Sequence, residues 1–321
     1  MERKFTLWRQ LLYLSCLILS LLLAGCGGQE EPAAERMGAY QVTDTTGTTM
    51  TFKEKPTRIA SLSVGTDEIL LDLVAADRIQ MLTHWADDPS LSNVVDKAKA
   101  VPHRFKGGAS ESLLSCDPDL ILVADYTSAE NYQTLRDVGV NVYVYKTPSN
   151  LEEIKACIRE VAAVVGEREQ GEILVQNMER KMEVIQQQLG PIPPEKQKSV
   201  LHVGATGAYY TPKGTFRDVC RQALVKDATG VLDYGQTCLL SQEVIVSLNP
   251  DSFVIADWNY DGKNPPEALR DELLQNQSYS TTTAGKNGSV IAIPAAHLLS
   301  CSHYFVLAVE DMARANYPER F

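Results

Sequence analysis

ESLLSCDPDLILVAD at residues 111–125 and EVIVSLNPDSFVIAD at residues 243–257 align without a gap, and this internal repeat decides the fold. Glu, Ser, Pro, Asp, Ala and Asp recur at the same places in both copies. Each copy predicts a short helix, a turn at the proline and an uninterrupted apolar strand. Proline disfavours helix in the residue before it, so Asp117 and Asn249 should end the two helices. Strands that are apolar on both faces are typical of parallel sheets covered by helices, so the repeat predicts two similar α/β lobes.

The sequence around the repeat alternates between further strands and helices. A strand is expected at residues 58–65 with a helix at 66–75 after it, and further strands at 140–145, 199–203 and 289–293. Alternation of this kind is typical of βα units.

The middle of the chain carries apolar residues at helical spacing from 151 to 189, interrupted at 166–171. The pattern predicts two helices, the second of which runs from one lobe to the other until a run of prolines stops it. The predicted fold class is therefore α/β, with Rossmann-like lobes at 40–166 and 191–321 joined by a long backbone helix at 167–190.

The N-terminus has the order of a secretory signal. Arg3, Lys4 and Arg9 precede an apolar stretch at 11–23 that is too short for a comfortable membrane span. Small residues then lead into Cys26, and the sequence LLAGC resembles a bacterial lipobox. In a lipobox the cysteine is acylated and becomes the first residue, so Cys26 is the predicted lipidation site and membrane anchor.

Residues 1–25 are accordingly predicted to be a lipoprotein signal peptide. Residues 26–39 are polar and without periodicity, as expected of a flexible tether. An uncleaved anchor helix is the alternative interpretation of the apolar stretch. The full chain has a formal net charge of −11, and loss of the basic signal leaves the remainder more acidic. An acidic body argues against nucleic acid as a partner and against the body lying on anionic lipid.

Five cysteines follow the lipobox, at spacings that match neither paired zinc knuckles nor a dense disulfide scaffold. Cys116 and Cys157 lie in apolar patterns and are expected to be small core residues. A bridge among Cys220, Cys238 and Cys301 stays open, because spacing does not fix disulfide geometry.

Residues 40–321 resemble the helix-backbone class (class III) of substrate-binding lipoproteins of ABC importers, which includes ferric-siderophore, cobalamin and haem binders. The resemblance implies a ligand cleft between two lobes that move little on binding. The marks that carry it are Val42-Thr-Asp44 with Gly47, Lys55-Pro56-Thr57-Arg58-Ile59, Ser61-Leu62-Ser63, Glu68-Ile69-Leu70, Asp77-Arg78-Ile79 and Pro118-Asp119-Leu120.

The resemblance also implies a function. A ferric siderophore is the expected ligand, with cobalamin or haem as the alternative, and no cofactor is expected. The expected partners are an ABC permease dimer and its cytoplasmic ATPase. The protein is expected to be an exported monomer, lipid-anchored to the cell membrane, with its body in the periplasm or on the extracellular face.

Ligands of open α/β sheets lie beyond the carboxyl ends of the strands, which points to the loops after each strand. Aromatic residues there suit a flat ligand gripped by stacking, and a guanidinium can pair with an anionic ligand group. Histidine can ligate iron, but a bare-metal cluster needs several converging ligands and is not expected from a chain with 5 histidines. The predicted ligand-binding residues are Trp85, His103, Arg104, Phe105, Tyr126, Tyr209, Trp258 and His297.

Glu111 and Glu243 begin the two copies of the repeat, so the pseudo-twofold relation places one on each lobe. A glutamate in the first turn of a helix interacts favourably with the helix dipole, which is the ordinary explanation. In the resembling family, glutamates at the matching positions insert among permease arginines. The resemblance therefore implies that both residues dock the protein on its transporter.

The chain is not expected to be an enzyme. It has no Gly-x-Ser-x-Gly elbow, no Gly-x-x-x-x-Gly-Lys phosphate loop and no His-Glu-x-x-His helix. The turn at residues 204–207 lacks the spacing of a dinucleotide site. Two alternatives stay open: a surface hydrolase with Cys238 and His297 as nucleophile and base, and a lipoprotein that senses ligand for a signalling partner.

Overall fold

The structure, a computed structural model, separates residues 40–321, which form one compact unit, from residues 1–39. Cys26, the predicted signal peptide and most of the predicted tether lie outside the described residues. Within the described part of the chain, no helix has the length and apolarity needed to cross a bilayer. The described residues are 38–107, 110–258 and 265–321.

Both copies of the repeat form the predicted helix, turn and strand. Asp117 and Asn249 leave the helices with φ angles of 44° and 45°, a left-handed conformation that Asp and Asn tolerate better than most residues. The elements are α4 (Ser110–Leu114) and β6 (Leu120–Ala124) in the first copy, and α9 (Gln242–Leu248) and β12 (Ser252–Asp257) in the second.

The aspartate after each proline ties the repeat to a neighbouring strand. The Asp119 carboxylate accepts hydrogen bonds from the backbone amides of Thr57 and Arg58, at 2.8 and 3.0 Å. The Asp251 carboxylate accepts one from the backbone amide of Ser199, at 2.8 Å. Backbone donors at the start of a buried strand need partners, so the same Pro-Asp pair serves the same purpose in both lobes.

The first sheet defines the N-lobe and contains five parallel strands in the order β5-β4-β3-β6-β7. The chain enters at the central strand β3, runs outward to β5, and then crosses to β6 and β7. The direction of winding therefore reverses between β3 and β6, a topological switch point of the kind at which ligands bind. The strands other than β6 are β3 (Ile59–Ser61), β4 (Ile79–Thr83), β5 (His103–Phe105) and β7 (Val142–Tyr145).

The second sheet defines the C-lobe and contains four parallel strands in the order β10-β8-β12-β13, with its switch point between β8 and β12. Two antiparallel ribbons accompany the sheets, β1 with β2 and β9 with β11. The strands other than β12 are β8 (Ser199–His202), β10 (Lys226–Asp227), β13 (Val290–Pro294), β1 (Tyr40–Thr43), β2 (Thr49–Phe52), β9 (Tyr209–Tyr210) and β11 (Cys238–Leu239).

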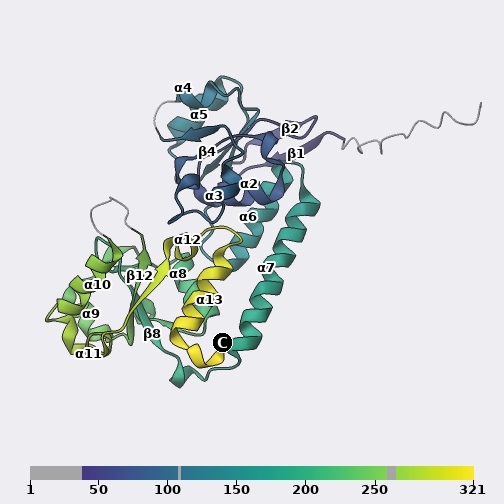
Figure 1. The fold of residues 1–321 in the computed structure, drawn as a ribbon. Helices are drawn as coiled ribbons and strands as arrows, with labels where there is room; N and C mark the ends of the chain where they lie inside the picture. Colours follow the sequence, from purple (N-terminus) through teal and green to yellow (C-terminus); the bar gives the residue numbers. More distant parts are fainter. Residues whose placement is uncertain (1–37, 108–109, 259–264) are drawn as a thin grey trace, which may run out of the picture. The chain divides into compact units, whose positions relative to one another are not determined.

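A helix of 22 residues, α7 (Arg168–Leu189), follows the N-lobe and leads to the C-lobe. It packs along α6 (Leu151–Val164) and against α13 (Phe305–Asn316) from the end of the chain (Figure 1). The fold is therefore the predicted one, and the lobe limits at 40–166 and 191–321 stay a prediction. The buried face of α7 joins a core shared with both sheets and consists of Val175, Met178, Met182, Ile185 and Leu189.

The strand expected at residues 58–65 is shorter in the structure, because helix α2 (Val64–Leu73) begins inside it. The Ser63 hydroxyl accepts a hydrogen bond from the backbone amide of Thr66 at 3.2 Å. A serine in this N-cap position satisfies an otherwise unpaired amide and starts the helix.

The remaining helices and 3-10 turns connect the strands. In the N-lobe they are η1 (Ala76–Arg78), η2 (His84–Asp87), α3 (Val95–Ala98) and α5 (Ala129–Asp137). After α7 they are η3 (Pro194–Lys196), α8 (Thr215–Gln222), η4 (Ala228–Val231), α10 (Pro266–Gln275), η5 (Tyr279–Thr281), α11 (Thr283–Asn287), α12 (Ala295–Leu298) and η6 (Pro318–Arg320).

Candidate functional site

A cavity of about 440 Å³ lies at the carboxyl ends of the N-lobe strands and is closed on its far side by the C-lobe. Its N-lobe wall comes from the segments that follow β3, β4, β6 and β7. Its C-lobe wall consists of Trp258, which follows β12, and residues 299–301. The cavity therefore occupies the switch-point position at which open α/β sheets bind ligands.

A second cavity, of about 410 Å³, lies at the carboxyl ends of β8 and β12 in the C-lobe. Residues 203–206, after β8, and Leu269 and Glu272 on α10 line it, and it shares Trp258 and Leu299 with the first cavity. The two cavities together are called the cleft from here on. Trp258, which the sequence predicts as a ligand contact, stands at their junction.

Two tryptophans from different lobes meet in the cleft. The rings of Trp85, after β4, and Trp258 have their centroids 6.1 Å apart at an interplanar angle of 86°. This edge-to-face arrangement is a favourable one for aromatic pairs. Tyr126, after β6, lines the same cavity. The structure thus brings together Trp85, Tyr126 and Trp258, and their contact with a ligand stays a prediction.

The hydroxyl groups of Ser63, Thr66 and Tyr145 line the N-lobe wall and form a row with that of the buried Ser61. The Ser63 hydroxyl lies 2.5 Å from the Tyr145 hydroxyl and 2.9 Å from that of Thr66, which lies 2.7 Å from that of Ser61. Hydroxyl groups both donate and accept hydrogen bonds, so this row can offer either a donor or an acceptor to a ligand. The predicted site residues did not include these hydroxyls, although Ser61-Leu62-Ser63 is among the motifs that carry the resemblance.

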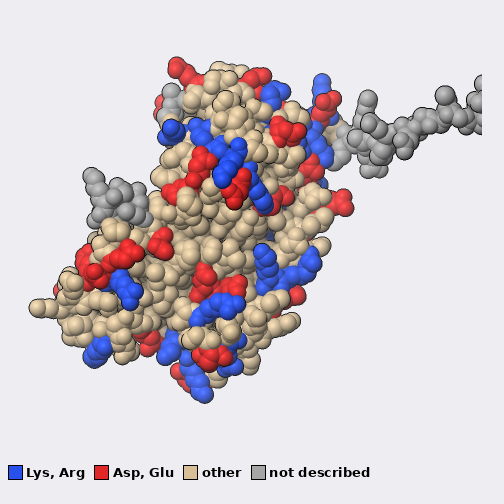
Figure 2. Space-filling model, viewed as in Figure 1, with Lys and Arg blue, Asp and Glu red and all other residues tan. Residues whose placement is uncertain are grey.

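The described residues that line the cleft include no lysine and no arginine. Its carboxylates are Glu68 and Glu272. Burial raises the pKa of the Glu68 carboxyl, and it raises the pKa of its fully buried neighbour Asp67 to about 7. The described cleft is therefore aromatic, hydroxyl-rich and without a positive charge. Elsewhere, acidic and basic side chains are mixed over the face drawn in Figure 2.

Three predicted residues, His103, Arg104 and Phe105, form the edge strand β5 and do not line the cleft. The Arg104 guanidinium makes a two-pronged pair with Asp87, with both N–O distances 2.8 Å. Its other N–H groups donate to the backbone carbonyls of residues 98, 101 and 103. A guanidinium has five N–H donors, and all are used within the N-lobe, so the predicted pairing of Arg104 with a ligand anion finds no free donor.

Tyr209 and His297 also lie outside the cleft lining. Tyr209 borders an adjoining C-lobe cavity of about 290 Å³, which shares His202, Gly204 and Thr206 with the cleft and has Lys213 and Arg217 in its lining. His297 Nδ1 lies 2.6 Å from the Asp311 carboxylate, so this ring is paired between α12 and α13. Burial lowers the pKa of His202, whose ring stacks on Phe216, as expected of a core histidine.

The five described cysteines are free, so no bridge joins Cys220, Cys238 and Cys301 in this structure. Cys157 is buried as expected, but it also borders the cleft with Cys301. The part of the chain that is described contains no group of three or more His, Cys, Asp or Glu residues able to hold a metal ion.

Glu111 and Glu243 occupy equivalent places outside the cleft. Each is exposed and lies in the first turn of its helix, α4 or α9, one on each lobe. Hydrogen bonds from Ser241 and from its own backbone amide lower the pKa of Glu243, so this carboxylate is negatively charged at neutral pH.

The family model described as periplasmic binding protein matches residues 59–296. The uncharacterized ABC transporter substrate-binding lipoprotein YvrC of Bacillus subtilis (strain 168) is 24% identical over 100% of this chain and 99% of its own length. A cobalamin-binding protein of Halobacterium salinarum is 21% identical over 91% of this chain and 79% of its own length.

Solved structures agree on the fold. The periplasmic heme-binding protein RhuT from Roseiflexus sp. RS-1 superposes with a TM-score of 0.68 at 21% identity, covering 82% of this chain and 99% of that one. A periplasmic binding protein from Veillonella parvula gives a TM-score of 0.71 at 19% identity, and the match covers 86% of this chain and 97% of that one. The family match spans both sheets and nearly all of the described cleft: the chain belongs to the periplasmic binding protein family and is a binding protein, not an enzyme.

Proposed function

We propose that this protein is the substrate-binding lipoprotein of an ABC importer and that its ligand is a flat metal complex without net negative charge, with a corrinoid such as cobalamin as first candidate. One observation carries the proposal: Trp85 and Trp258, from different lobes, meet edge-to-face in a cleft whose described lining has no lysine or arginine. Stacking on aromatic rings suits a flat macrocycle.

The charge of the cleft reorders the candidate ligands. The sequence alone favours a ferric siderophore, with cobalamin or haem as the alternative. A ferric catecholate complex is anionic and haem carries carboxylates, and burying such groups without a paired cation is costly. A corrinoid presents amide groups, which the hydroxyls of Ser63, Thr66 and Tyr145 can meet as neutral donors and acceptors. A ferric hydroxamate siderophore without net charge meets the same condition and keeps an iron complex as the alternative.

Haem requires an axial ligand as well, and the cleft lining offers Tyr126 in its N-lobe part and His202 in its C-lobe part. Tyr126 is 71% exposed, so its phenol is open to a ligand that enters the cleft. The carboxylates of haem would find no lysine or arginine in the described cleft lining, so haem ranks below the uncharged complexes. The likeness to heme-binding structures of low identity concerns the fold alone.

The lipid anchor and the transporter complete the proposal. Cys26 carries the lipid, residues 26–39 form the tether, and the folded body delivers ligand at the outer face of the cell membrane. Glu111 and Glu243 dock on cationic pockets of a permease dimer that a cytoplasmic ATPase drives. Their equivalent, exposed positions on the two lobes support this role, because two separated anionic groups fix an orientation that one group could not.

The full-length protein in detergent can be titrated with cyanocobalamin, ferrichrome, ferric enterobactin and haemin in turn, following visible absorption and tryptophan fluorescence. We expect cyanocobalamin to bind at least about tenfold more tightly than the anionic complexes, a difference of about 1.4 kcal/mol. Its affinity should change little with salt, because no described cation pairs with the ligand. Preferential binding of ferric enterobactin or haemin, weakened by salt, would overturn the ligand assignment.

A further inference from the structure

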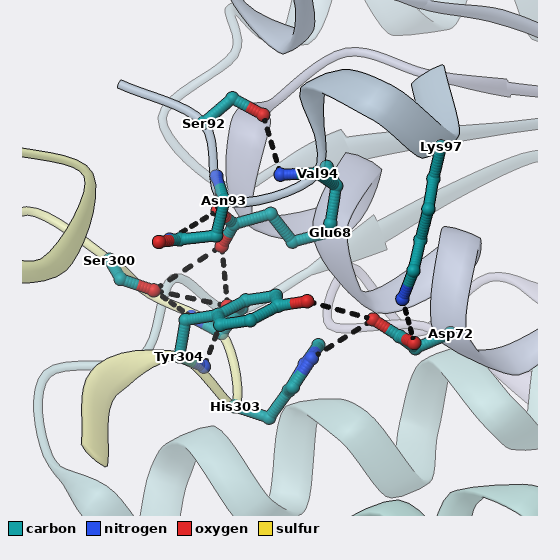
Figure 3. A network of polar contacts seen from close by, with 10 residues as sticks. Glu68, Asp72, Ser92, Asn93, Val94, Lys97, Ser300, His303 and Tyr304 are labelled. Carbon is teal, nitrogen blue, oxygen red and sulfur yellow. Dashed lines mark hydrogen bonds and ion pairs between the residues drawn. The ribbon is translucent and has the colours of Figure 1, made fainter. Parts of the chain in front are cut away.

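Glu68 on α2 has hydrogen-bond partners on both lobes although its side chain is almost completely buried (Figure 3). Its Oε1 accepts from the backbone amide of Asn93 at 3.0 Å and from the Asn93 side-chain amide at 2.8 Å. Its Oε2 accepts from the hydroxyls of Ser300, at 3.3 Å, and Ser302. One carboxylate therefore joins a loop of the N-lobe to a segment of the C-lobe more than 230 positions away in the sequence.

Two further contacts surround this carboxylate. The Asn93 side-chain amide also donates to the backbone carbonyl of Ala296, at 2.8 Å, which gives a second connection to the C-lobe. Asp72, one turn later on α2, pairs with His303 Nε2 at 3.2 Å and accepts from the Tyr304 hydroxyl at 3.3 Å. Helix α2 thus holds the segment 300–304 through two carboxylates, Glu68 and Asp72, both labelled in Figure 3.

The two carboxylates differ in their relation to the cleft. Leu299, Ser300 and Cys301 form the C-lobe wall of the cleft, and Glu68 lies in the lining itself. Asp72 is absent from that lining and borders a separate cavity beside α7. Glu68 therefore acts on the wall that faces a ligand, whereas Asp72 secures the same segment farther along α2.

The wall has little freedom where Glu68 holds it. A Cβ placed on Gly65, in the first turn of α2, would lie 3.4 Å from the Cβ of Cys301, so the two lobes are in close contact here. Ser302 is 0% exposed and its hydroxyl has Glu68, Ser300 and the backbone amide of Tyr304 as partners. Hydrogen bonds to a buried charge are stronger than neutral ones, so loss of the charge should release this wall first.

We propose that Glu68 is a positioning residue for ligand binding, because by holding Ser300 and Ser302 on α2 it sets how the C-lobe wall stands against the N-lobe wall. In this role Glu68 determines ligand affinity through the placement of Leu299–Cys301 and of Trp258 opposite Trp85. A carboxamide offers one acceptor oxygen in place of two. With that oxygen toward the Asn93 amides, its nitrogen faces Ser300 and Ser302, whose hydroxyls must then accept instead of donate. The affinity part of this inference rests on the proposed function, and the structural part does not.

The test uses the tryptophans as reporters of the cleft. The chain has 3 tryptophans, and Trp8 lies in the predicted signal peptide, outside the described residues, so the full-length protein with Trp8→Phe reports only on Trp85 and Trp258. Near-ultraviolet circular dichroism, tryptophan fluorescence, the thermal midpoint and the affinity for cyanocobalamin are measured for Glu68→Gln and Ser302→Ala. Asp72→Asn is the matched control, one turn away on the same helix and bound to the same segment.

Glu68→Gln should change the tryptophan dichroism and weaken cyanocobalamin binding about tenfold, the value of one hydrogen bond to a charged group. Ser302→Ala should cause a smaller change in tryptophan dichroism and a smaller loss of cyanocobalamin affinity. It tests the same contact if Glu68→Gln fails to fold. The double variant with Glu68→Gln and Ser302→Ala should bind cyanocobalamin no more weakly than Glu68→Gln alone, since both changes interrupt the same contact between Glu68 and Ser302. Asp72→Asn should lower the thermal midpoint while keeping the affinity within about twofold.

A merely structural role predicts another pattern. If Glu68→Gln and Ser302→Ala lowered the thermal midpoint as Asp72→Asn does, with tryptophan dichroism and affinity unchanged, the positioning role would be refuted. If the wild-type protein bound no cyanocobalamin, the proposed ligand would be wrong, and the dichroism of the variants would still decide whether Glu68 sets the cleft geometry.

Discussion

Replacing Trp85 by alanine tests whether the cleft binds its ligand by aromatic stacking. The Trp85 ring lies edge-to-face with Trp258 from the other lobe, and 38% of the residue surface is exposed. A flat ligand that enters the cleft must cover this exposed indole surface and displace the ring from its contact with Trp258. The change in affinity is the difference between these two effects.

The magnitude follows from the exposed area. If a tryptophan residue has up to about 250 Å² of surface, the exposed share of Trp85 is about 95 Å². Covering it at about 25 cal/mol per Å² contributes about 2.4 kcal/mol to binding. Breaking the contact with Trp258 costs about 0.5–1.5 kcal/mol. Trp85→Ala should therefore weaken binding by about 1–2 kcal/mol, which is roughly a 5- to 30-fold increase in Kd.

The assay is isothermal titration of the full-length protein with cyanocobalamin. Tyr209→Ala is the matched control, because Tyr209 is 43% exposed, similar to Trp85, but lies outside the cleft lining. We expect the affinity of the Tyr209→Ala variant to stay within about twofold of wild type. Without ligand, Trp85→Ala should also lower the thermal midpoint, because the buried remainder of the residue, about 155 Å², contributes about 4 kcal/mol at the same coefficient, or about 7 °C.

Unchanged affinity in the Trp85→Ala variant would refute the stacking model, provided that the protein is folded. Equal losses in the Trp85→Ala and Tyr209→Ala variants would also contradict it, because the ligand would then extend beyond the cleft defined here. A loss much larger than about 30-fold would show that Trp85 does more than present an apolar face.

Three other predictions concern stability, anchoring and docking. Asp44→Asn removes the fully buried carboxylate that pairs with Arg136, and should cost about 3–5 kcal/mol, or about 5–8 °C in the thermal midpoint measured by calorimetry. Burial acts to raise the pKa of Asp44, but the hydrogen bonds to its carboxylate and the charge of Arg136 outweigh this and lower the pKa. The stabilisation that the Asp44 carboxylate contributes should therefore be complete above the ordinary pKa of about 4 and be lost as the pH falls through the lower pKa of the folded state. Cys26→Ser should leave the precursor unprocessed or release the protein from membranes in a fractionation assay, and recovery of full-length wild type without detergent would contradict lipid anchoring. Glu111→Ala with Glu243→Ala should keep ligand binding and the thermal midpoint while permease association and transport in reconstituted vesicles fall; wild-type transport by this double variant would exclude docking through these residues.

The fold could be predicted from the sequence because its determinants are local. The repeat around Pro118 and Pro250 specifies helix, turn and strand within 15 residues, and both copies form these elements. Helical spacing likewise predicted α7 to within about two residues, the usual uncertainty of helix limits. The aromatic residues Trp85 and Trp258 could be expected at the site because each directly follows a strand, where parallel sheets present their loops.

Which of those loops line the cleft depends on the tertiary structure alone. Arg104 lies in strand β5 and His297 in helix α12, where Asp87 and Asp311 pair with them, and neither residue lines the cleft. No local pattern indicates such pairings, because a charged side chain takes whatever partner the packing brings within reach.

The same reason explains why the role of Glu68 follows only from the folded structure. In the sequence Glu68 stands out only as part of a motif that carries the family resemblance, and its partners Ser300 and Ser302 are more than 230 positions away. Sequence periodicity reports which face of a helix is buried, but the choice of partner depends on the order of the strands and on how the two lobes close. A buried carboxylate is stable only where donors surround it, so its role became visible only once both lobes were in place.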